Sequence, residues 1–416
     1  MKKSKLGEVL SISSMSVIPQ AGITYKLYSL PSFDDGQEPE TAGSETIQSN
    51  KYVVPTRCIL FNKLNVRFKR IWRINNNIPN KLCSTEFLPL VINEDLIDYQ
   101  YCYYLLASDY LTNYLCGINS NTSGSHKRIN PDILLSVDVA LPTLNEQKRI
   151  GSMLANLDRK IEINRAINHN LEAIAKQLYD YWFVQFDFPN TEGKPYKSSG
   201  GKMVWNEKLK REIPEEWHCG NLFEIATFTN GLACQKFRPK DGEVPLPVIK
   251  IREMHDGISS DTEEVSPNIP ESVKVYNGDV LFSWSASLEV MLWACGLGGL
   301  NQHIFKVTSS NDFPKSFYYF QLLNYVDVFK KMAEARKTTM GHITQDHLQQ
   351  STIAIPDNKD IVDKFEKRIS PIFAQMVKLQ EEIQQLSKQR DELLPLLMNG
   401  QASLNYDLSA DRKSVV

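Results

Sequence analysis

The stretch IGSMLANLDRKIEINRAINHNLEAIAKQLYDYW, residues 150–182, decides how the chain is organised. Mostly apolar residues recur in it at alternating spacings of four and three: Ile150, Leu154, Leu157, Ile161, Asn164, Asn168, Leu171, Ala175, Leu178 and Trp182. This spacing keeps one seam of a helix facing a partner, as in a left-handed coiled coil. At about 1.5 Å per residue, such a helix spans roughly 50 Å. The sequence therefore predicts a second helix that covers the seam.

A second series with the same spacing supplies that partner. It follows the first by 215 residues at every position: Phe365, Ile369, Ile372, Met376, Leu379, Ile383, Leu386, Arg390, Leu393 and Leu397. Asn164 and Asn168 stand where the second series has Leu379 and Ile383. Polar seam residues can fix the register of a helix pair at a cost in stability. The alternative is that each helix packs on a globular neighbour instead of on the other helix.

The repeat continues upstream of the helices. Ile129, Asp132, Leu134, Ala140 and Pro142 match residues 214 positions later, namely Ile343, Asp346, Leu348, Ala354 and Pro356. A repeat this long is a domain followed by a helix, since solenoid repeats are far shorter. We therefore expect an α+β protein in which two mixed α/β domains are joined by two long antiparallel coiled-coil helices with a pseudo-twofold internal repeat. The expected segments are domains at 1–143 and 214–357, helices at 144–183 and 358–400, a linker at 184–213 and a polar tail at 401–416.

Local signals fill in this outline. Short apolar runs at 52–54, 59–61 and 137–141 predict strands, and the Tyr- and Leu-rich residues 96–114 predict a helix. Asn145 is placed to cap the first long helix. The turn-rich composition of 187–214 predicts a linker. Pro371 should kink or restart the second long helix, because proline removes a backbone donor.

The composition excludes several classes of protein. The chain has 416 residues with a net charge of −2, which leaves room for local basic patches but not for a generally basic protein. Its 7 cysteines are odd in number and form no C-x-x-C pair, so reduced thiols are expected rather than a zinc ribbon or a disulfide framework. No apolar run approaches the roughly 18 residues of a membrane span. The sequence predicts a soluble, cytoplasmic protein.

Motifs for catalysis and cofactor binding are absent from the sequence. Gly200-Gly-Lys lacks the upstream glycine of a phosphate-binding loop, and His342 and His347 are not spaced to share a metal on one helix face. No methyltransferase motif of the Asn-Pro-Pro-Tyr type occurs. The repeated Asp132 and Asp346 each precede a strand, where a turn or cap role is favoured over acid–base chemistry. We expect a protein that binds without catalysing, with no cofactor and no metal.

Basic residues cluster at several places in both copies. The candidates for contact with DNA are Lys63, Arg67, Lys69, Arg70, Arg73, His126, Lys127 and Arg128 in the first copy, and Lys236, Arg238, Lys250, Arg252, Lys330, Arg336, Lys337 and His342 in the second. Lysine and arginine contacts to phosphate supply affinity and orientation, and side chains that reach base edges supply sequence choice. An ordinary solvated face is the alternative for any single cluster.

The chain resembles the specificity subunits of type I restriction–modification systems over its whole architecture, and most strongly in its central block. The resemblance rests on the motifs Leu141-Pro-Thr-Leu-Asn-Glu-Gln-Lys-Arg-Ile, Asp158-Arg-Lys-Ile, Leu178-Tyr-Asp-Tyr-Trp-Phe-Val-Gln-Phe-Asp-Phe-Pro, Gly193-Lys-Pro-Tyr-Lys-Ser-Ser-Gly-Gly-Lys-Met-Val-Trp, Ile213-Pro-Glu-Glu-Trp and Leu393-Leu-Pro-Leu-Leu-Met-Asn-Gly. It implies two target-recognition domains that each read one half of a split asymmetric site on double-stranded DNA. It also implies spacer helices that dock two methyltransferase subunits, which restriction subunits then join.

The resemblance leaves two other functions to be weighed. One is a stand-alone DNA-binding or scaffold protein that uses its coiled coil without restriction partners, and the other is a lone nuclease or methyltransferase. Half-sites on one face of B-form DNA lie about 34–36 Å apart, a distance that a stiff helical pair can hold. A flexible Gly/Ser tether could not fix that distance. We therefore expect the gap between half-sites to depend on the helices and the bases read to depend on the loops.

Overall fold

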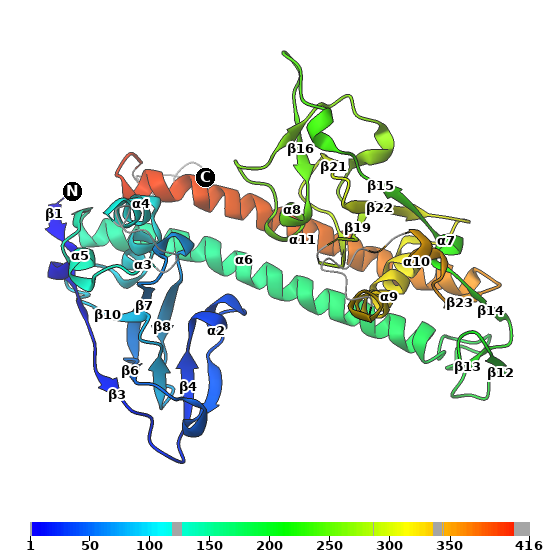
Figure 1. Ribbon diagram of the computed structural model, residues 1–416, viewed down its shortest axis with the longest axis horizontal. Coiled ribbons are helices and arrows are strands. Elements are labelled where there is room, and N and C mark those ends of the chain that lie inside the picture. The colour runs from blue at the N-terminus through cyan, green and yellow to red at the C-terminus, as the bar shows by residue number, and fades with distance from the viewer. Residues whose placement is uncertain (1, 119–126, 286, 336–342, 344, 403–416) are drawn as a thin grey trace, which may run out of the picture. The chain divides into compact units, whose positions relative to one another are not determined.

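The computed structural model describes residues 2–118, 127–285, 287–335, 343 and 345–402 (Figure 1). The chain divides into two compact units, one made of Met1–Arg159 with Leu386–Val416 and the other of Lys160–Gln385. This division is not linear along the sequence. Each unit contains one copy of the repeat together with part of both long helices, whereas the sequence predicted separate domain and helix segments.

Each unit contains a four-stranded antiparallel sheet with the same strand order. In the first unit the order is β2 (Leu10–Ile12), β10 (Phe87–Ile92), β7 (Arg57–Asn62) and β8 (Ile71–Asn75). In the second unit it is β15 (Ala226–Asn230), β22 (Ile304–Ser309), β19 (Val280–Ser283) and β20 (Glu289–Leu292). The predicted strand at 59–61 lies in β7, at the centre of its sheet. The internal repeat is therefore a repeat of topology as well as of sequence.

A second sheet in each unit differs between the copies. The first unit has five strands in the order β3 (Ser16–Val17), β6 (Lys51–Val53), β9 (Lys81–Cys83), β4 (Thr24–Tyr28) and β5 (Glu40–Gly43). The second has four, in the order β17 (Glu264–Val265), β16 (Leu246–Ile249), β21 (Gly298–Leu300) and β18 (Lys274–Val275). Each sheet contains one parallel pair, β4 with β9 and β16 with β21. The two copies therefore differ in the number and order of strands in this second sheet.

A two-stranded antiparallel sheet joins the start of each copy to its end. In the first copy, β1 (Lys2–Lys5) pairs with β11 (Asp138–Leu141). In the second, β14 (Trp217–Gly220) pairs with β23 (Ile353–Pro356). In each copy the first strand thus pairs with the last strand, and a long helix follows directly after that last strand. In the first copy, β1 takes the place that β14 takes in the second copy.

Short helices complete each copy. The first has α1 (Leu6–Val9), α2 (Leu30–Asp34), α3 (Tyr99–Ala107), α4 (Asp109–Ile118) and α5 (Pro131–Leu135), and the second has α7 (Leu222–Ile225), α8 (Ile251–Asp256), α9 (Lys315–Ala335) and α10 (Gln345–Gln349). The helix predicted over 96–114 is thus split into α3 and α4. Tyr99 is 2% exposed and donates its hydroxyl to the carbonyls of Cys58 and Ile74, at 3.0 and 3.1 Å. These bonds fix α3 against the four-stranded sheet.

The two long helices are α6 (Leu144–Tyr179) and α11 (Asp360–Met398). The N-cap of α6 is Thr143 and not Asn145, because Thr143 and Glu146 form a capping box: the Thr143 hydroxyl accepts from the Glu146 amide at 3.4 Å, and the Thr143 amide donates to the Glu146 carboxylate at 2.9 Å. The expectation that Pro371 restarts the second helix is also wrong. Pro371 is exposed within the unbroken helix α11, and the buried Ile369 and Phe373 on either side hold both turns in place.

The helices run antiparallel in each unit. In the second unit, Asn164 donates to Glu382 at 2.9 Å and the rings of Tyr179 and Phe365 lie 5.9 Å apart. In the first, Arg390 donates to Asp158 at 3.1 Å. Of the predicted seam residues, Ile150, Leu154, Ile161, Asn164, Met376, Leu379 and Ile383 are buried, and Leu157, Asn168, Leu171, Leu178, Ile372, Leu386 and Leu393 are partly buried.

The seam contacts both the other helix and the globular part of each unit. Tyr179 stacks on Phe320 of α9 with ring centroids 5.2 Å apart while also meeting Phe365 of α11. In the first unit, Ile150 and Leu154 share a core with Leu397 and with residues of α3. Helix–helix packing and packing on a globular neighbour, which the sequence presented as alternatives, therefore occur together.

The segment expected to be a linker is folded. It contains the antiparallel strands β12 (Met203–Asn206) and β13 (Arg211–Pro214). Phe188 stacks between Tyr196 and Trp217, with ring centroids 4.7 and 5.7 Å away. Asp187 is 9% exposed and accepts hydrogen bonds from the amide and hydroxyl of Ser198 at 2.7 and 2.6 Å. Turn residues in this segment build tight turns around an aromatic cluster, so composition alone was a misleading signal.

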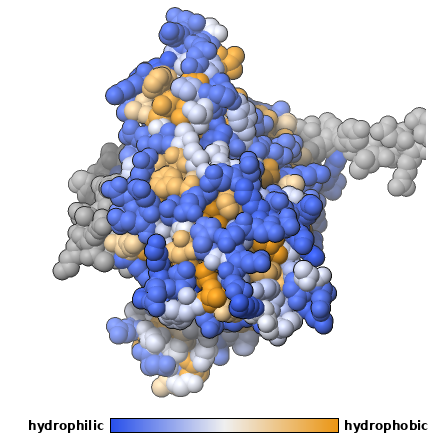
Figure 2. All heavy atoms as spheres, turned by 90° about the vertical axis from the view of Figure 1, so that its right-hand side faces the viewer, coloured by the Kyte–Doolittle hydropathy of each residue, from blue (hydrophilic) through white to orange (hydrophobic). Residues whose placement is uncertain are grey.

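The surface seen in Figure 2 is mainly hydrophilic, and its hydrophobic residues form separate small spots. Within the part of the chain that the structure describes, no helix combines the length and the apolar character that a membrane crossing requires. All seven cysteines are free thiols. Burial raises the pKa of the Cys58 thiol to about 12, which keeps that sulfur in its unreactive protonated form.

Candidate nucleic-acid interface

The turn between β7 and β8 projects a basic loop from the first unit. A single 3-10 turn, Val66–Phe68, is flanked by Asn65 and Lys69, which both have left-handed backbone angles, with φ of 52° and 47°. Non-glycine residues adopt this conformation at a cost, and such residues cluster at functional sites. Val66 is buried under the turn, and Arg67 and Phe68 face solvent.

Residues after α4 return to this loop and add to its charge. Leu64 and Arg128 form an antiparallel bridge, the Asn65 amide donates to the Lys127 carbonyl at 2.8 Å, and the Ile129 amide donates to the Lys63 carbonyl at 3.0 Å. We call the resulting group the first basic surface: Lys63, Arg67, Lys69, Arg70, Lys127 and Arg128. His126, the other candidate here, lies outside the described residues.

Carboxylates hold several of these cations in place. Lys69 pairs with Asp109 at 2.5 Å, Arg70 binds Asp34 through two bonds of 2.7 and 2.8 Å, and Arg128 pairs with Glu86 at 2.8 Å. The six cations against these three carboxylates leave a net charge of +3. Exposed ion pairs of this kind contribute little to stability. Phosphate oxygens can therefore replace the carboxylates as partners of these cations.

Arg73 lies apart from the first basic surface. Its side chain is 27% exposed, it donates to Gln100 at 3.2 Å, and its guanidinium carbon lies 4.3 Å from the centre of the Tyr103 ring. Its guanidinium also lies 4.0 Å from the Asp158 carboxylate. Burial acts to lower the pKa of Arg73, and the neighbouring Tyr103 and Asp158 raise it overall. Arg73 thus has internal partners, and we leave it out of the proposed interface.

Four predicted basic residues of the second unit form what we call the second basic surface: Lys236, Arg238, Lys250 and Arg252. Lys250 pairs with Glu263, and Arg252 pairs with Glu253 at 2.7 Å. The pKa of Glu263 is lowered first by its hydrogen bond to Lys250 and then by the charges of Lys250, Arg252 and Arg238, so these groups lie around one carboxylate. Lys236 and Arg238 are exposed, and neither forms an ion pair with any residue in the described part of the chain.

The remaining candidates do not extend this surface. Lys330 is exposed on α9, and no contact among the described residues brings it to the other four. Arg336, Lys337 and His342 lie outside the described residues. His347, which with His342 lacks the spacing of a metal pair, is buried in α10, where it is 5% exposed.

The two basic surfaces come from non-equivalent parts of the repeat. The Ile343 amide donates to the Trp284 carbonyl at 3.0 Å, which reproduces the bond from Ile129 to Lys63 in the first copy. The turn at 283–288 nevertheless contains no lysine or arginine, whereas the corresponding turn at 63–70 contains four. The same backbone framework therefore carries different side chains at its loops. Sequence reasoning found the basic residues but could not show that they occupy different positions in the two copies.

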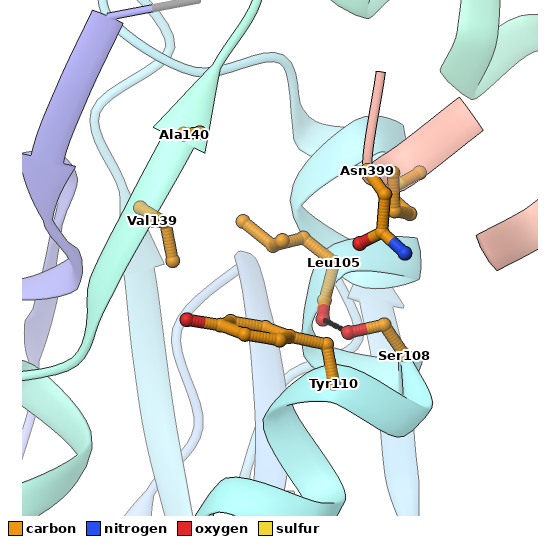
Figure 3. Close-up of a pocket in the computed structure, with 7 residues that line it drawn as sticks. Leu105, Ser108, Tyr110, Val139, Ala140 and Asn399 are labelled. Carbon is orange, nitrogen blue, oxygen red and sulfur yellow. Dashed lines mark hydrogen bonds between the residues drawn. The ribbon is translucent and has the colours of Figure 1, made fainter. Parts of the chain in front are cut away.

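The first unit contains a cavity near the end of α11. One pocket of about 210 Å³ in the first unit is lined by neutral side chains from α3, α4, β11 and the end of α11, among them Tyr110, Val139 and Asn399 (Figure 3). Its wall is fixed by the Ser108 hydroxyl, which donates to the Leu105 carbonyl at 2.7 Å. Among the residues that the structure describes, no three His, Cys, Asp or Glu side chains are grouped to hold a metal ion.

Comparison with known proteins gives the same family throughout. Residues 1–173 and 214–389 match the model of the type I restriction modification DNA specificity domain. The chain is 24% identical over 331 residues to the type I restriction enzyme MjaIX specificity subunit of Methanocaldococcus jannaschii, which covers 77% of this chain and 73% of that protein. It is 22% identical over 402 residues to the type I restriction enzyme HindI specificity subunit of Haemophilus influenzae. This match covers 82% of this chain and 86% of that protein.

The fold is likewise similar to a solved structure. The type I restriction–modification S subunit from M. genitalium superposes with a TM-score of 0.58 at 13% identity, over 95% of this chain and 96% of that one. The family model matches both copies of the repeat, from the first recognition domain through most of the second long helix. The chain therefore belongs to the type I restriction modification DNA specificity family, with one specificity domain in each half of the sequence.

Proposed function

We propose that this chain is the non-catalytic subunit that selects the DNA target of a type I restriction–modification complex. The first unit reads one half of an asymmetric bipartite site through the first basic surface, and the second unit reads the other half through the second basic surface. Methyltransferase and restriction subunits bind to the chain and carry out the chemistry.

One observation carries this proposal: the duplicated four-stranded sheets have the same strand order but different loop chemistry. Phosphate contacts are common to all DNA sequences, whereas base contacts differ between sequences. Two copies with the same framework and different loops are suited to bind the same polymer at two different sequences. A scaffold protein would have no use for two diverged basic surfaces.

The long helices support a spacer role. Helix α6 has 36 residues, which corresponds to about 54 Å at the usual helical rise. Both long helices contribute residues to both units, so the chain passes from one unit to the other within a helix and not through a flexible tether. We infer that helix length restricts the gap between the two half-sites.

An apolar stripe on α6 supports the docking of a partner. Ile163, Ile167 and Ile174 are 48%, 41% and 55% exposed, and their spacing of four and seven residues places them on one face of the helix. Exposed isoleucines in helical register are typical of a surface that receives another amphipathic helix. We assign this stripe to a methyltransferase subunit.

The proposal predicts how activity depends on the partner. Purified chain incubated with labelled methyl donor and duplex DNA should transfer no methyl group. With its methyltransferase subunit added, it should methylate duplexes selected from a randomised pool, and these should share two fixed blocks separated by a fixed number of unspecified bases. Ile167→Glu should prevent this assembly on size exclusion, because a buried charge opposes docking.

The matched control is Ile18→Glu, which changes another isoleucine that is 75% exposed but lies away from α6. It should assemble and methylate normally. Methyl transfer by the chain alone, or selection of a single uninterrupted block by the complex, would overturn the proposed function.

A further inference from the structure

Each basic surface contains one exposed phenylalanine between two cations. Phe68 is 53% exposed and lies between Arg67 and Lys69, and Phe237 is 39% exposed and lies between Lys236 and Arg238. The two rings occupy non-equivalent places, Phe68 between β7 and β8 and Phe237 after β15. The same pattern of cation, ring and cation has thus been placed on both surfaces by different loops.

The ring of Phe68 is held outward by its surroundings. The guanidinium carbons of Arg67 and Arg70 lie 4.7 and 5.0 Å from its centre. Arg70 is itself fixed by its double bond to Asp34. The left-handed backbone at Lys69 ends the 3-10 turn immediately after the ring. The ring is therefore flanked by two cations that are positioned to reach phosphates.

Phe237 is presented by an equally fixed backbone. Its amide donates to the Cys234 carbonyl at 2.9 Å, and its carbonyl accepts from the Ser266 amide at 2.8 Å. Cys234 is 3% exposed and belongs to a small hydrophobic core with Val248 of β16 and Val265 of β17. Phe237 follows the 3-10 turn Cys234–Lys236, as Phe68 closes the turn Val66–Phe68.

Packing within the protein does not account for either ring. Neither Phe68 nor Phe237 belongs to a hydrophobic core of the described residues. Leaving an aromatic ring in water gives up a favourable burial energy. A ring between phosphate-binding cations regains that energy when the cations bring it against the base edges of a DNA groove.

We propose that Phe68 and Phe237 are apolar wedges, one for each half-site, that enter a groove of double-stranded DNA and pack against a base step. This inference rests on the proposed function and adds to it the side chains that contribute base selectivity. Flanking cations hold the backbone, and each ring discriminates among the steps that can accommodate it. The charges beside each ring favour DNA over an apolar protein surface as its partner.

The test uses the complete chain assembled with its methyltransferase subunit and a pool of duplexes with randomised bases. Phe68→Ala should relax base preference in one half-site only, and Phe237→Ala in the other only. Each should weaken binding to the wild-type target about tenfold, the usual size of one lost base contact. The salt dependence of binding should not change, because no phosphate contact is removed. Phe68→Leu should keep most of the selectivity, since leucine also serves as a wedge.

Trp205→Ala is the matched control, because Trp205 is 58% exposed but has Val204 and Asn206 beside it rather than cations. It should leave both half-sites unchanged. If the wild-type complex selects no bipartite motif, the proposed function itself fails. If the wild type selects such a motif and both phenylalanine variants select it unchanged, the wedge inference alone is overturned. Loss of methyltransferase assembly in Phe68→Ala would identify the ring as a protein contact and would also overturn it.

Discussion

Replacing Asp158 by alanine is expected to destabilise the first unit by about 3–5 kcal/mol, the range for removing one partner of a largely buried ion pair. The side chain of Asp158 is 13% exposed. Its carboxylate accepts from the Tyr104 hydroxyl at 2.5 Å and from Arg390 at 3.1 Å, and Arg73 lies 4.0 Å away. The substitution would leave the Tyr104 and Arg390 donors without this acceptor and would remove the negative charge beside Arg73.

The Asp158 cluster connects four elements of one unit. Asp158 lies on α6, Arg390 on α11, Tyr104 on α3 and Arg73 on β8. Burial raises the pKa of the Tyr104 hydroxyl, and its bond to the Asp158 carboxylate raises it further. Burial acts to lower the pKa of Arg390, but its bond to Asp158 contributes to raising it overall. The helix pair is therefore tied to the recognition domain by charge as well as by apolar contact.

Thermal unfolding measures this effect. For a unit of this size, a loss of about 3–5 kcal/mol lowers the midpoint of its transition by roughly 6–20 °C. Asp391→Ala is the matched control, because Asp391 also pairs with Arg390, at 2.8 Å, but its side chain is 65% exposed. Exposed pairs are weak, so this control should shift the midpoint little. Equal shifts in the two variants would show that the Asp158 cluster has no special role.

Neutralising Arg67, Lys69 and Arg70 together, each to glutamine, is expected to weaken DNA binding by the complex roughly 100-fold at moderate salt. The variant loses three cations of the first basic surface. It also leaves Asp109 and Asp34 without their ion-pair partners and facing the DNA phosphates. A plot of the logarithm of the binding constant against the logarithm of the salt concentration should then be less steep, with a slope about three smaller in magnitude.

A second triple variant controls for the change in net charge. Lys194, Lys208 and Lys210 are exposed lysines of the folded segment 187–214, and their replacement by glutamine also removes three charges. Affinity and salt slope should both stay near the wild-type values, because these lysines lie outside both basic surfaces. Comparable losses in the two triple variants would show that binding follows overall charge and not the loop at 63–70.

The periodic parts of the chain were predictable because they depend on local spacing. The 4-3 series starting at Ile150 and Phe365 correctly indicated two long helices and their duplication, since helical periodicity is a property of neighbouring residues. The strand before Pro142 was predicted from the alternation of apolar and polar residues, which is also a pattern of neighbouring residues. The family resemblance, carried by motifs of the central segment, is confirmed by the match to both copies.

Features that depend on residues far apart in sequence were not predictable. Nothing local indicates that Arg128 bridges to Leu64 or that Arg73 meets Asp158, and these contacts separate surface cations from internal ones. The parallel pairing of β4 with β9 joins residues more than fifty positions apart. The folded segment at 187–214 was missed because turn residues are common both to linkers and to compact hairpins.

The most direct test of the central claim is a chain in which the second recognition domain is replaced by a second copy of the first. The paired strands β1–β11 and β14–β23 provide the junctions, and Pro142 matches Pro356, so residues 217–356 would be replaced by 2–142. This chain would be assembled with its methyltransferase, and the duplexes that the complex methylates would be sequenced. These duplexes should share an inverted repeat of one wild-type half-site, because both domains then read the same bases in opposite orientations. A target that keeps the other wild-type half-site would contradict the assignment of one half-site to each domain.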